Sequence, residues 1–230
     1  MILYDPVSGD ACISPMSWSP RTCFLMTKLG ASVPQKVKSI RKQVSFLFKR
    51  HNYHIIDADS ITSGKDYLLK IWKLIVSVPI GIAIIDESMT AQTLSNVFYE
   101  LGCMDSLGKE TIIVKTSNFR MPSDFVRTEH ISFDRDFPRR LKNFISALDA
   151  RVDFYATVAE QLERNPLLAI DYYRRAFLIS GEACYCDRAA EIFQTAGIKD
   201  RAANSVEMLL AGFAAGSILK GAKQASATKD

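Results

Sequence analysis

Between residues 21 and 137, short apolar runs alternate with longer stretches whose apolar residues recur every three or four positions. The short runs predict buried strands, and the longer stretches predict amphipathic helices. The predicted strands are Cys23–Met26, His54–Ile56, Gly81–Ile85, Thr111–Lys115 and His130–Phe133, and the predicted helices are Val37–Arg50, Tyr67–Val76 and Thr90–Leu107. This alternation predicts an α/β domain over residues 21–137, with a mainly parallel, flavodoxin-like sheet between helices.

The pattern changes after Phe137-Pro138, because no strand-like run follows. Residues 138–230 are therefore predicted to form a helical domain, in which Phe144–Leu148 and Phe154–Leu162 belong to separate helices. Residues 165–177 and 189–197 resemble a pair of tetratricopeptide-type helices, but at most about two such repeats fit, so a helical cap or oligomerisation module is favoured. Residues 1–20 are rich in Pro, Ser and Gly and predict an irregular N-terminal arm.

Charge and composition narrow the range of partners. The formal net charge of +4 is spread thinly, which does not favour nucleic acid. No apolar run reaches the roughly 20 residues that span a bilayer, and no signal-peptide pattern opens the chain. Among five cysteines, Cys184 and Cys186 are close but lack a second pair or a nearby histidine, so reduced, buried thiols are expected rather than zinc. We expect a cytoplasmic protein without metal.

Topology alone selects a first set of candidate binding residues. Ligands of open parallel sheets bind beyond the carboxyl ends of the strands. Four segments are predicted to lie there: the loop Thr27, Lys28, Leu29 and Gly30, the segment 57–64 with Asp59, the turn with Asp86 and Ser88, and the start of the next helix.

The stretch Asn96-Val97-Phe98-Tyr99-Glu100-Leu101-Gly102 adds a second set. In a helix, Asn96 and Glu100 are four residues apart and share one side, and Tyr99 adjoins them. We expect Glu100 to lie one to two turns into its helix, where partial burial at the crevice would raise the pKa of its carboxyl group. The alternative is an ordinary exposed helix glutamate.

Several of these pieces together resemble the nucleoside deoxyribosyltransferase-like superfamily, which includes TIR-like nucleotide-binding proteins. The resemblance rests on Cys23–Met26, Asp86, the Asn96–Gly102 motif and Leu107-Gly108-Lys109, in order over about 110 residues. It implies that Glu100 is the catalytic carboxylate of N-glycosidic cleavage, that Asp86 lies near the base or sugar, and that Thr27–Gly30 skirts the nucleotide. The chain has Thr27-Lys28-Leu29-Gly30 where members commonly have Pro-Phe-Gly after the methionine, which argues against base exchange and supports a module that does not turn over its ligand.

Three functions follow from this resemblance. The first is an N-glycosidase that cleaves NAD or a related nucleotide, in the manner of a bacterial antiviral defence effector whose helical region controls assembly or contacts a partner protein. The second is a nucleotide-sensing module without turnover. The third is a scaffold with a degenerate pocket. In the first two cases a nucleotide is the substrate or the ligand, and no separate cofactor is implied.

Overall fold

A computed structural model describes residues 9–10, 16–30, 33–58, 67–116, 119–125, 129–162, 164–197, 206–207 and 210–213. The chain divides into two compact units. One consists of Arg21–Leu148, and the other combines Met1–Pro20 with Asp149–Asp230. The boundary near residue 148 falls inside one long helix, α4 (Phe137–Gln161).

The first unit is an α/β fold, as predicted. Its five described strands form one sheet in the order β2-β1-β3-β4-β5, and every neighbouring pair is parallel. The strands are β1 (Thr22–Met26), β2 (His54–Asp57), β3 (Ile80–Ile85), β4 (Glu110–Lys115) and β5 (His130–Ser132). This order is that of a flavodoxin-like fold, in which the chain reverses its direction of winding between β1 and β3.

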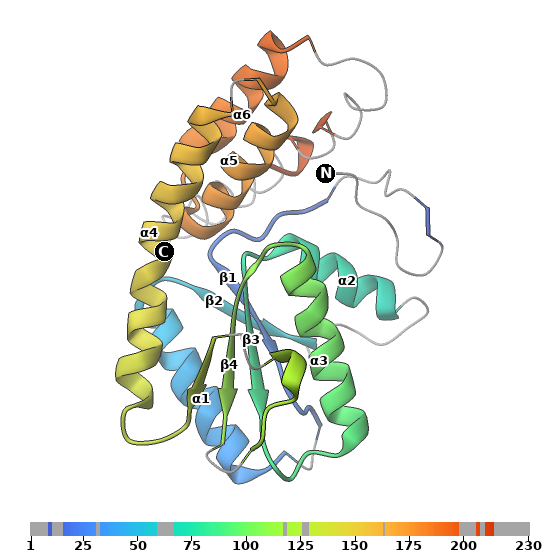
Figure 1. Cartoon of the computed structure of the whole chain (residues 1–230), viewed down its shortest axis with the longest axis vertical. Coiled ribbons are helices and arrows are strands. Elements are labelled where there is room, and N and C mark those ends of the chain that lie inside the picture. The colour runs from blue at the N-terminus through green and yellow to red at the C-terminus, as the bar shows by residue number, and fades with distance from the viewer. Residues whose placement is uncertain are drawn as a thin grey trace, which may run out of the picture. The chain divides into compact units, whose positions relative to one another are not determined.

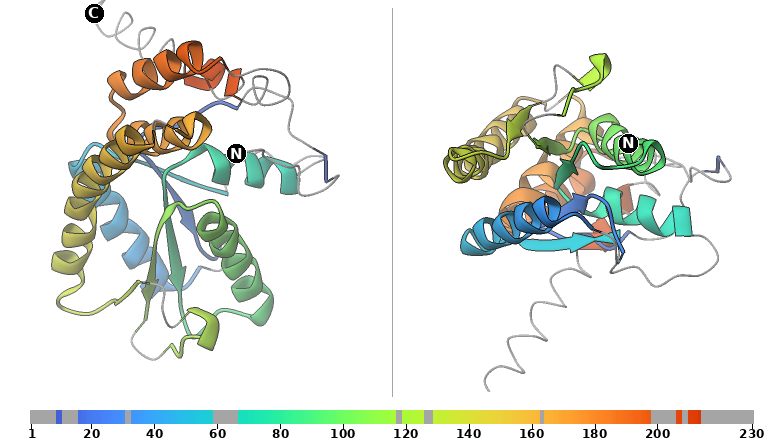
Figure 2. Two further views of the ribbon diagram at one scale, coloured as in Figure 1. Left: turned by 45° about the horizontal axis from the view of Figure 1, so that its top comes forward. Right: turned by 90° about the horizontal axis from the view of Figure 1, so that it is seen from below.

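Helices cover both faces of this sheet. Figure 2 shows α1 and the first part of α4 on one face, and α2 and α3 on the other. Three of these helices connect the strands: α1 (Gln35–Arg50), α2 (Tyr67–Ser77) and α3 (Ala91–Ser106). Each therefore begins near the carboxyl edge of the sheet and returns to the amino edge. A short 3₁₀ turn, η2 (Ser123–Phe125), follows β4 (Figure 1).

The central strands are buried along their whole length, because helices cover both of their faces. All five residues of β1 and all six of β3 are buried. Gly81 in β3 leaves room for α3, since a Cβ there would lie 2.3 Å from Met104 Sδ and 2.9 Å from Met26 Cε. Met26 and Met104 therefore occupy the same face of the sheet.

The second unit contains the described helices that follow residue 148. These are the remainder of α4, α5 (Pro166–Ser180) and α6 (Cys184–Thr195). Asn165 caps α5 through its side chain, Pro166 occupies the first turn, and Gly181 ends the helix with φ = 76°. The prediction of two helices over 144–162 is wrong, because α4 continues without a break from Phe137 to Gln161.

A segment that precedes the sheet belongs to this helical unit. Met16 and Trp18 are buried, and a Cβ on Gly212 would lie 2.1 Å from the Met16 carbonyl oxygen and 2.4 Å from Trp18 Nε1. Trp18 also lies beside Phe213, with ring centroids 6.3 Å apart. The absence of a side chain at Gly212 thus accommodates the segment that carries Met16 and Trp18.

A buried ionic cluster lies next to Trp18. Arg174, only 2% exposed, donates from Nε and Nη2 to Asp171 Oδ1 at 3.0 and 2.7 Å. Arg175 donates to the other carboxylate oxygen at 3.1 Å. The guanidinium of Arg174 lies 5.2 Å from the Trp18 ring centroid, a cation–π distance. Although burial alone would raise the pKa of Asp171, the two arginines lower it to about 2.

Among the helices that the described residues form, none combines the length and the apolar character needed to span a bilayer.

The expectation of uniformly buried thiols is wrong, because Cys184 is exposed while Cys23 is buried; Cys12 lies outside the described residues.

Candidate functional site

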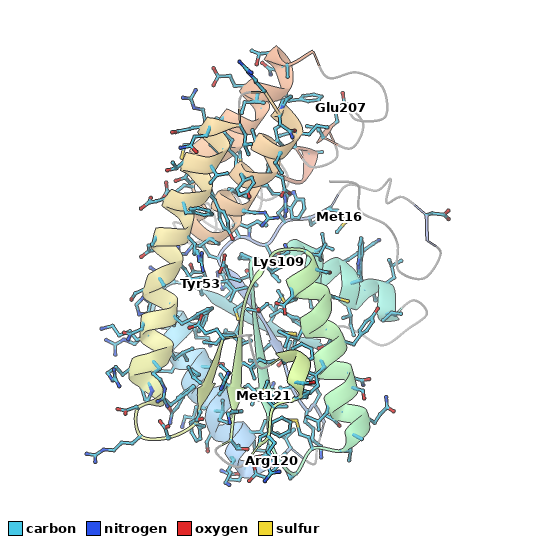
Figure 3. The ribbon with its side chains drawn as sticks, viewed as in Figure 1. Met16, Tyr53, Lys109, Arg120, Met121 and Glu207 are labelled. Atoms are coloured by element: carbon cyan, nitrogen blue, oxygen red, sulfur yellow. The ribbon has the colours of Figure 1, made fainter. Side chains whose placement is uncertain are left out.

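The carboxyl edge of the sheet is where topology predicts a ligand. Figure 3 labels Arg120 and Met121 beyond the carboxyl end of β4, and Tyr53 and Lys109 at the opposite, amino edge. The winding reversal lies between β1 and β3, so the loops after these two strands flank the predicted crevice. Thr27, Lys28, Leu29 and Gly30 follow β1, and Asp86 and Ser88 follow β3, as expected.

The loop after β1 begins with a buried hydroxyl. Thr27 is 8% exposed, and its Oγ1 has no hydrogen-bond partner among the residues that the structure describes. Lys28 and Leu29 are partly buried, and Gly30 is exposed with φ = 88°, a left-handed conformation that favours glycine. A buried hydroxyl without a partner costs free energy, so a ligand that hydrogen-bonds Thr27 would recover it.

The turn after β3 is held by Asp86. This residue is 3% exposed, and its Oδ1 accepts hydrogen bonds from the Ser88 amide at 3.0 Å and from the Ser88 hydroxyl. The Met89 amide donates to the Asp86 carbonyl oxygen at 3.0 Å, which closes the turn. Asp86 therefore has a structural task of its own, in addition to the sugar- or base-binding role predicted for it.

At the same edge, Glu87 of the predicted turn meets two residues that were not predicted, Lys36 and Thr116. Glu87 accepts a hydrogen bond from the Thr116 hydroxyl and pairs with Lys36 Nζ at 3.3 Å. These residues follow β3 and β4 and open α1, so three separate segments converge here. The Thr116 hydrogen bond is the main cause that lowers the pKa of Glu87, and Lys36 adds to it. The sequence signal for this cluster was the position of Glu87 in the turn after the third predicted strand.

The remaining candidate from this edge cannot be placed. Asp59 lies outside the described residues. The last residue of β2, Asp57, pairs with Arg41 of α1 and is partly buried.

Glu100 is partly buried in α3, and burial raises the pKa of its carboxyl group to about 7. Within the described ranges, its carboxylate makes no hydrogen bond or ion pair. A carboxyl group that loses water without gaining a donor prefers its neutral form, which explains the direction of the shift. The predicted rise in pKa therefore agrees with the structure, and the exposed-glutamate alternative does not.

The depth of Glu100 along α3 differs from the expectation. Thr90 caps the helix by accepting the Thr93 amide at 3.2 Å, so α3 begins at Ala91 and Glu100 comes nine residues later. At ~1.5 Å per residue this is about 13 Å, or two and a half turns, rather than one to two. The extra polar residues between Ser88 and Asn96 lengthen the first part of the helix.

The side of α3 that carries Glu100 follows from helix geometry. Val97, Leu101 and Met104 are buried against the sheet. At ~100° per residue, Phe98 lies on one flank of this stripe and Glu100 on the other. Phe98 stacks on Phe125 of η2 at 4.6 Å, so Glu100 occupies the flank away from η2, on the side of α2 (Figures 1 and 2).

The two predicted neighbours of Glu100 differ in position. Asn96 is exposed on the same flank, and its Oδ1 accepts a hydrogen bond from Gln92 Nε2 at 3.2 Å. Tyr99 is 51% exposed and points away from the buried stripe. No hydrogen bond or ion pair between described residues joins Glu100 to Thr27, Asp86 or Ser88.

The helical unit has a groove of its own. It lies between α4, α5 and α6 and encloses about 480 Å³. Glu160, Tyr173, Arg188 and Glu191 are among its lining residues, and Arg188 pairs with Glu191 at 2.8 Å. This volume is in the range of small-molecule sites, and no sequence pattern had indicated the groove. Among the described side chains, no cluster of three or more His, Cys, Asp or Glu residues could hold a metal.

Comparison with known proteins adds little to this geometry. No family model and no curated protein matches the chain. Among solved structures, a 2-deoxyribosyltransferase from the psychrotolerant bacterium Bacillus psychrosaccharolyticus matches 53% of this chain and 90% of its own, with 14% identity and a TM-score of 0.40. Similarity at this level assigns neither an activity nor a substrate to the present chain.

Proposed function

We propose that the α/β unit binds a nucleotide at the carboxyl edge of β1 and β3 and hydrolyses a base–ribose bond, as in NAD or a related nucleotide. The observation that carries this proposal is Glu100, a partly buried carboxyl group without a partner among the described residues. Asp171, by contrast, is buried with two arginines, as a structural carboxylate usually is. An unpaired, desolvated carboxyl group in an α/β unit is typical of a functional site.

The chemistry that suits this residue is cleavage through an oxocarbenium-like transition state. As the bond between ribose C1′ and the base nitrogen breaks, positive charge develops on the sugar, and the ionised Glu100 would stabilise it. Water then supplies hydroxide to C1′ and a proton to the departing base. The proposed binding residues are Thr27 to Gly30, Asp86, Ser88, Asn96 and Tyr99. Asp59 is added to them on the sequence prediction alone.

The pH dependence separates this role from general-acid catalysis. If Glu100 acts as a carboxylate, activity rises with pH and levels off above the pKa of about 7. If it donates a proton to the base, activity falls over the same interval. Our proposal predicts the rise.

The direct test is base release from NAD and from a panel of nucleosides and nucleotides, followed by chromatography. We expect Glu100→Gln to abolish release while retaining ligand binding by calorimetry. Glu129→Gln makes the same change at an exposed position of the same unit and should behave as wild type. Equal release by wild type and Glu100→Gln would refute the catalytic role.

A second candidate is a nucleotide-sensing module whose helical region mediates assembly. Its supporting observation is the apolar surface of the helical unit, where Phe154, Leu167 and Leu168 are 52%, 37% and 40% exposed. Light scattering with and without NAD or cyclic nucleotides would measure assembly. Ligand-dependent assembly without base release in either state would favour this second function. A defence role in bacteria rests on the resemblance of the motif alone.

A further inference from the structure

We propose that the amino end of α1 is an anion site, formed by Thr27 Oγ1, the first amides of α1 and Lys36, and that it selects ligands bearing a phosphate. This inference rests on the proposed function, because it names the class of nucleotide that the same edge would bind.

The helix itself supplies unpaired donors. Pro34 precedes α1 and offers no side-chain cap, and the Lys38 amide is the first to bond within the helix, to the Pro34 carbonyl at 3.0 Å. The amides of Gln35, Lys36 and Val37 have no described acceptor. The first turn of this 16-residue helix contains no acidic residue, so its partial positive charge is not offset within that turn.

An independent observation comes from Thr27. Met26 lies on the α3 face of the sheet, because its Cε and Met104 Sδ both crowd the Cβ position of Gly81. Residues alternate between the two faces along β1, and this alternation, continued by one residue past Met26, directs Thr27 to the face that α1 covers (Figure 2). Thr27 directly follows β1, at the edge of the sheet where α1 begins. Its buried, unpartnered hydroxyl is therefore directed toward the start of α1.

A bound phosphate would compete with Glu87 for the positive charge of Lys36. Lys36 pairs with Glu87 across 3.3 Å, and both side chains are largely solvent-accessible. An exposed pair of this kind is weak, so an incoming phosphate can compete for the lysine. Glu87 would repel the same phosphate, since the Thr116 hydroxyl holds it close by. The two residues should therefore act on anion binding in opposite directions.

The proposed anion is a phosphate because its oxygens can accept from several converging donors at once. Helix amides, a hydroxyl and an ammonium group together form a typical phosphate site. A nucleoside without phosphate would leave these donors unused. The ligand is accordingly a nucleoside phosphate or dinucleotide rather than a free nucleoside.

The test compares binding of adenosine, 5′-AMP, NAD and inorganic phosphate by calorimetry, all on the full chain. We expect Lys36→Met to weaken binding of 5′-AMP by about tenfold or more, and Glu87→Gln to strengthen it roughly twofold to fivefold. Adenosine binding should not respond to either change. Lys42→Met removes the same charge two turns further along α1 and is the matched control.

Thr27→Val provides a readout independent of charge. It should weaken 5′-AMP binding while leaving the free protein as stable as wild type or more stable, because an unsatisfied buried hydroxyl is removed. Equal effects of Lys36→Met and Lys42→Met, or no effect of Glu87→Gln, would overturn the site. If unphosphorylated nucleosides release their base as fast as nucleotides do, the anion site is refuted and the proposed hydrolytic activity stands. If the protein binds phosphate-bearing ligands selectively but releases no base, the anion site stands and the hydrolytic activity is refuted.

Discussion

Glu100 and Asp171 are both carboxylates on helices, one in each unit, and they differ in what replaces the water they lose. Glu100 gains no donor among the described residues, and its pKa rises to about 7. Asp171 gains two arginines, and its pKa falls to about 2. Burial alone would raise both values, so the partners decide the direction. The paired carboxylate stabilises a helical unit, and the unpaired one is the better candidate for chemistry.

The largest expected effect is on the paired group. Asp171→Asn leaves Arg174 buried with an uncompensated charge, and we expect a loss of about 3–5 kcal/mol in the free energy of unfolding. Urea denaturation followed by circular dichroism measures it, and hydrogen exchange should localise it to α5. Asp153→Asn on the exposed side of α4 is the control. A loss below about 1 kcal/mol would contradict the structural role given to this cluster.

The unpaired group should behave in the opposite way. The folded protein binds the Glu100 proton more tightly than the unfolded chain, so stability falls as pH rises from 4.5 towards the folded pKa of about 7. Glu100→Gln should therefore stabilise the protein at pH 8, by about 3 kcal/mol at most, and change little at pH 5. Thermal denaturation at both pH values checks this. Destabilisation at pH 8 would indicate that Glu100 has a partner after all.

The N-terminal segment offers a smaller perturbation of the helical unit. Gly212→Ala places a Cβ against the Met16 carbonyl group, which belongs to the backbone and cannot move aside alone. We expect a loss of about 1–3 kcal/mol from overpacking. Fluorescence of Trp18 should report the displaced segment. Unchanged stability together with unchanged fluorescence would show that the segment does not pack there in solution.

The smallest expected effect is a gain on the flank of α3 opposite Glu100. Gly102 lies within α3, and a Cβ there would have nothing within 4 Å. Gly102→Ala should therefore stabilise the protein by about 0.5–1 kcal/mol through helix propensity. Chemical denaturation without ligand measures the gain. A loss instead would mean that another part of the chain closes over this flank of α3.

Local pattern was sufficient to predict the order of strands and helices in the α/β unit. Buried runs such as Ile80–Ile85 and the periodic apolar residues of α1 depend on neighbours in sequence, so every predicted strand and helix there lies within a few residues of its observed position. The pattern over 144–162 was read as two helices because no rule from spacing alone distinguishes a continuous helix from two abutting ones.

Contacts between distant segments could not be read in this way. Three features of the structure depend on residues that are far apart in the chain. They are the Lys36–Glu87–Thr116 cluster, the packing of Trp18 beside Arg174, and the lack of a described partner for Glu100. The sequence determined which residues are polar, apolar or ionisable and which elements carry them. Only the tertiary structure decided which buried carboxylates gain a hydrogen-bond donor in place of water. The free energy of that interaction distinguishes a structural carboxylate from a candidate catalytic one.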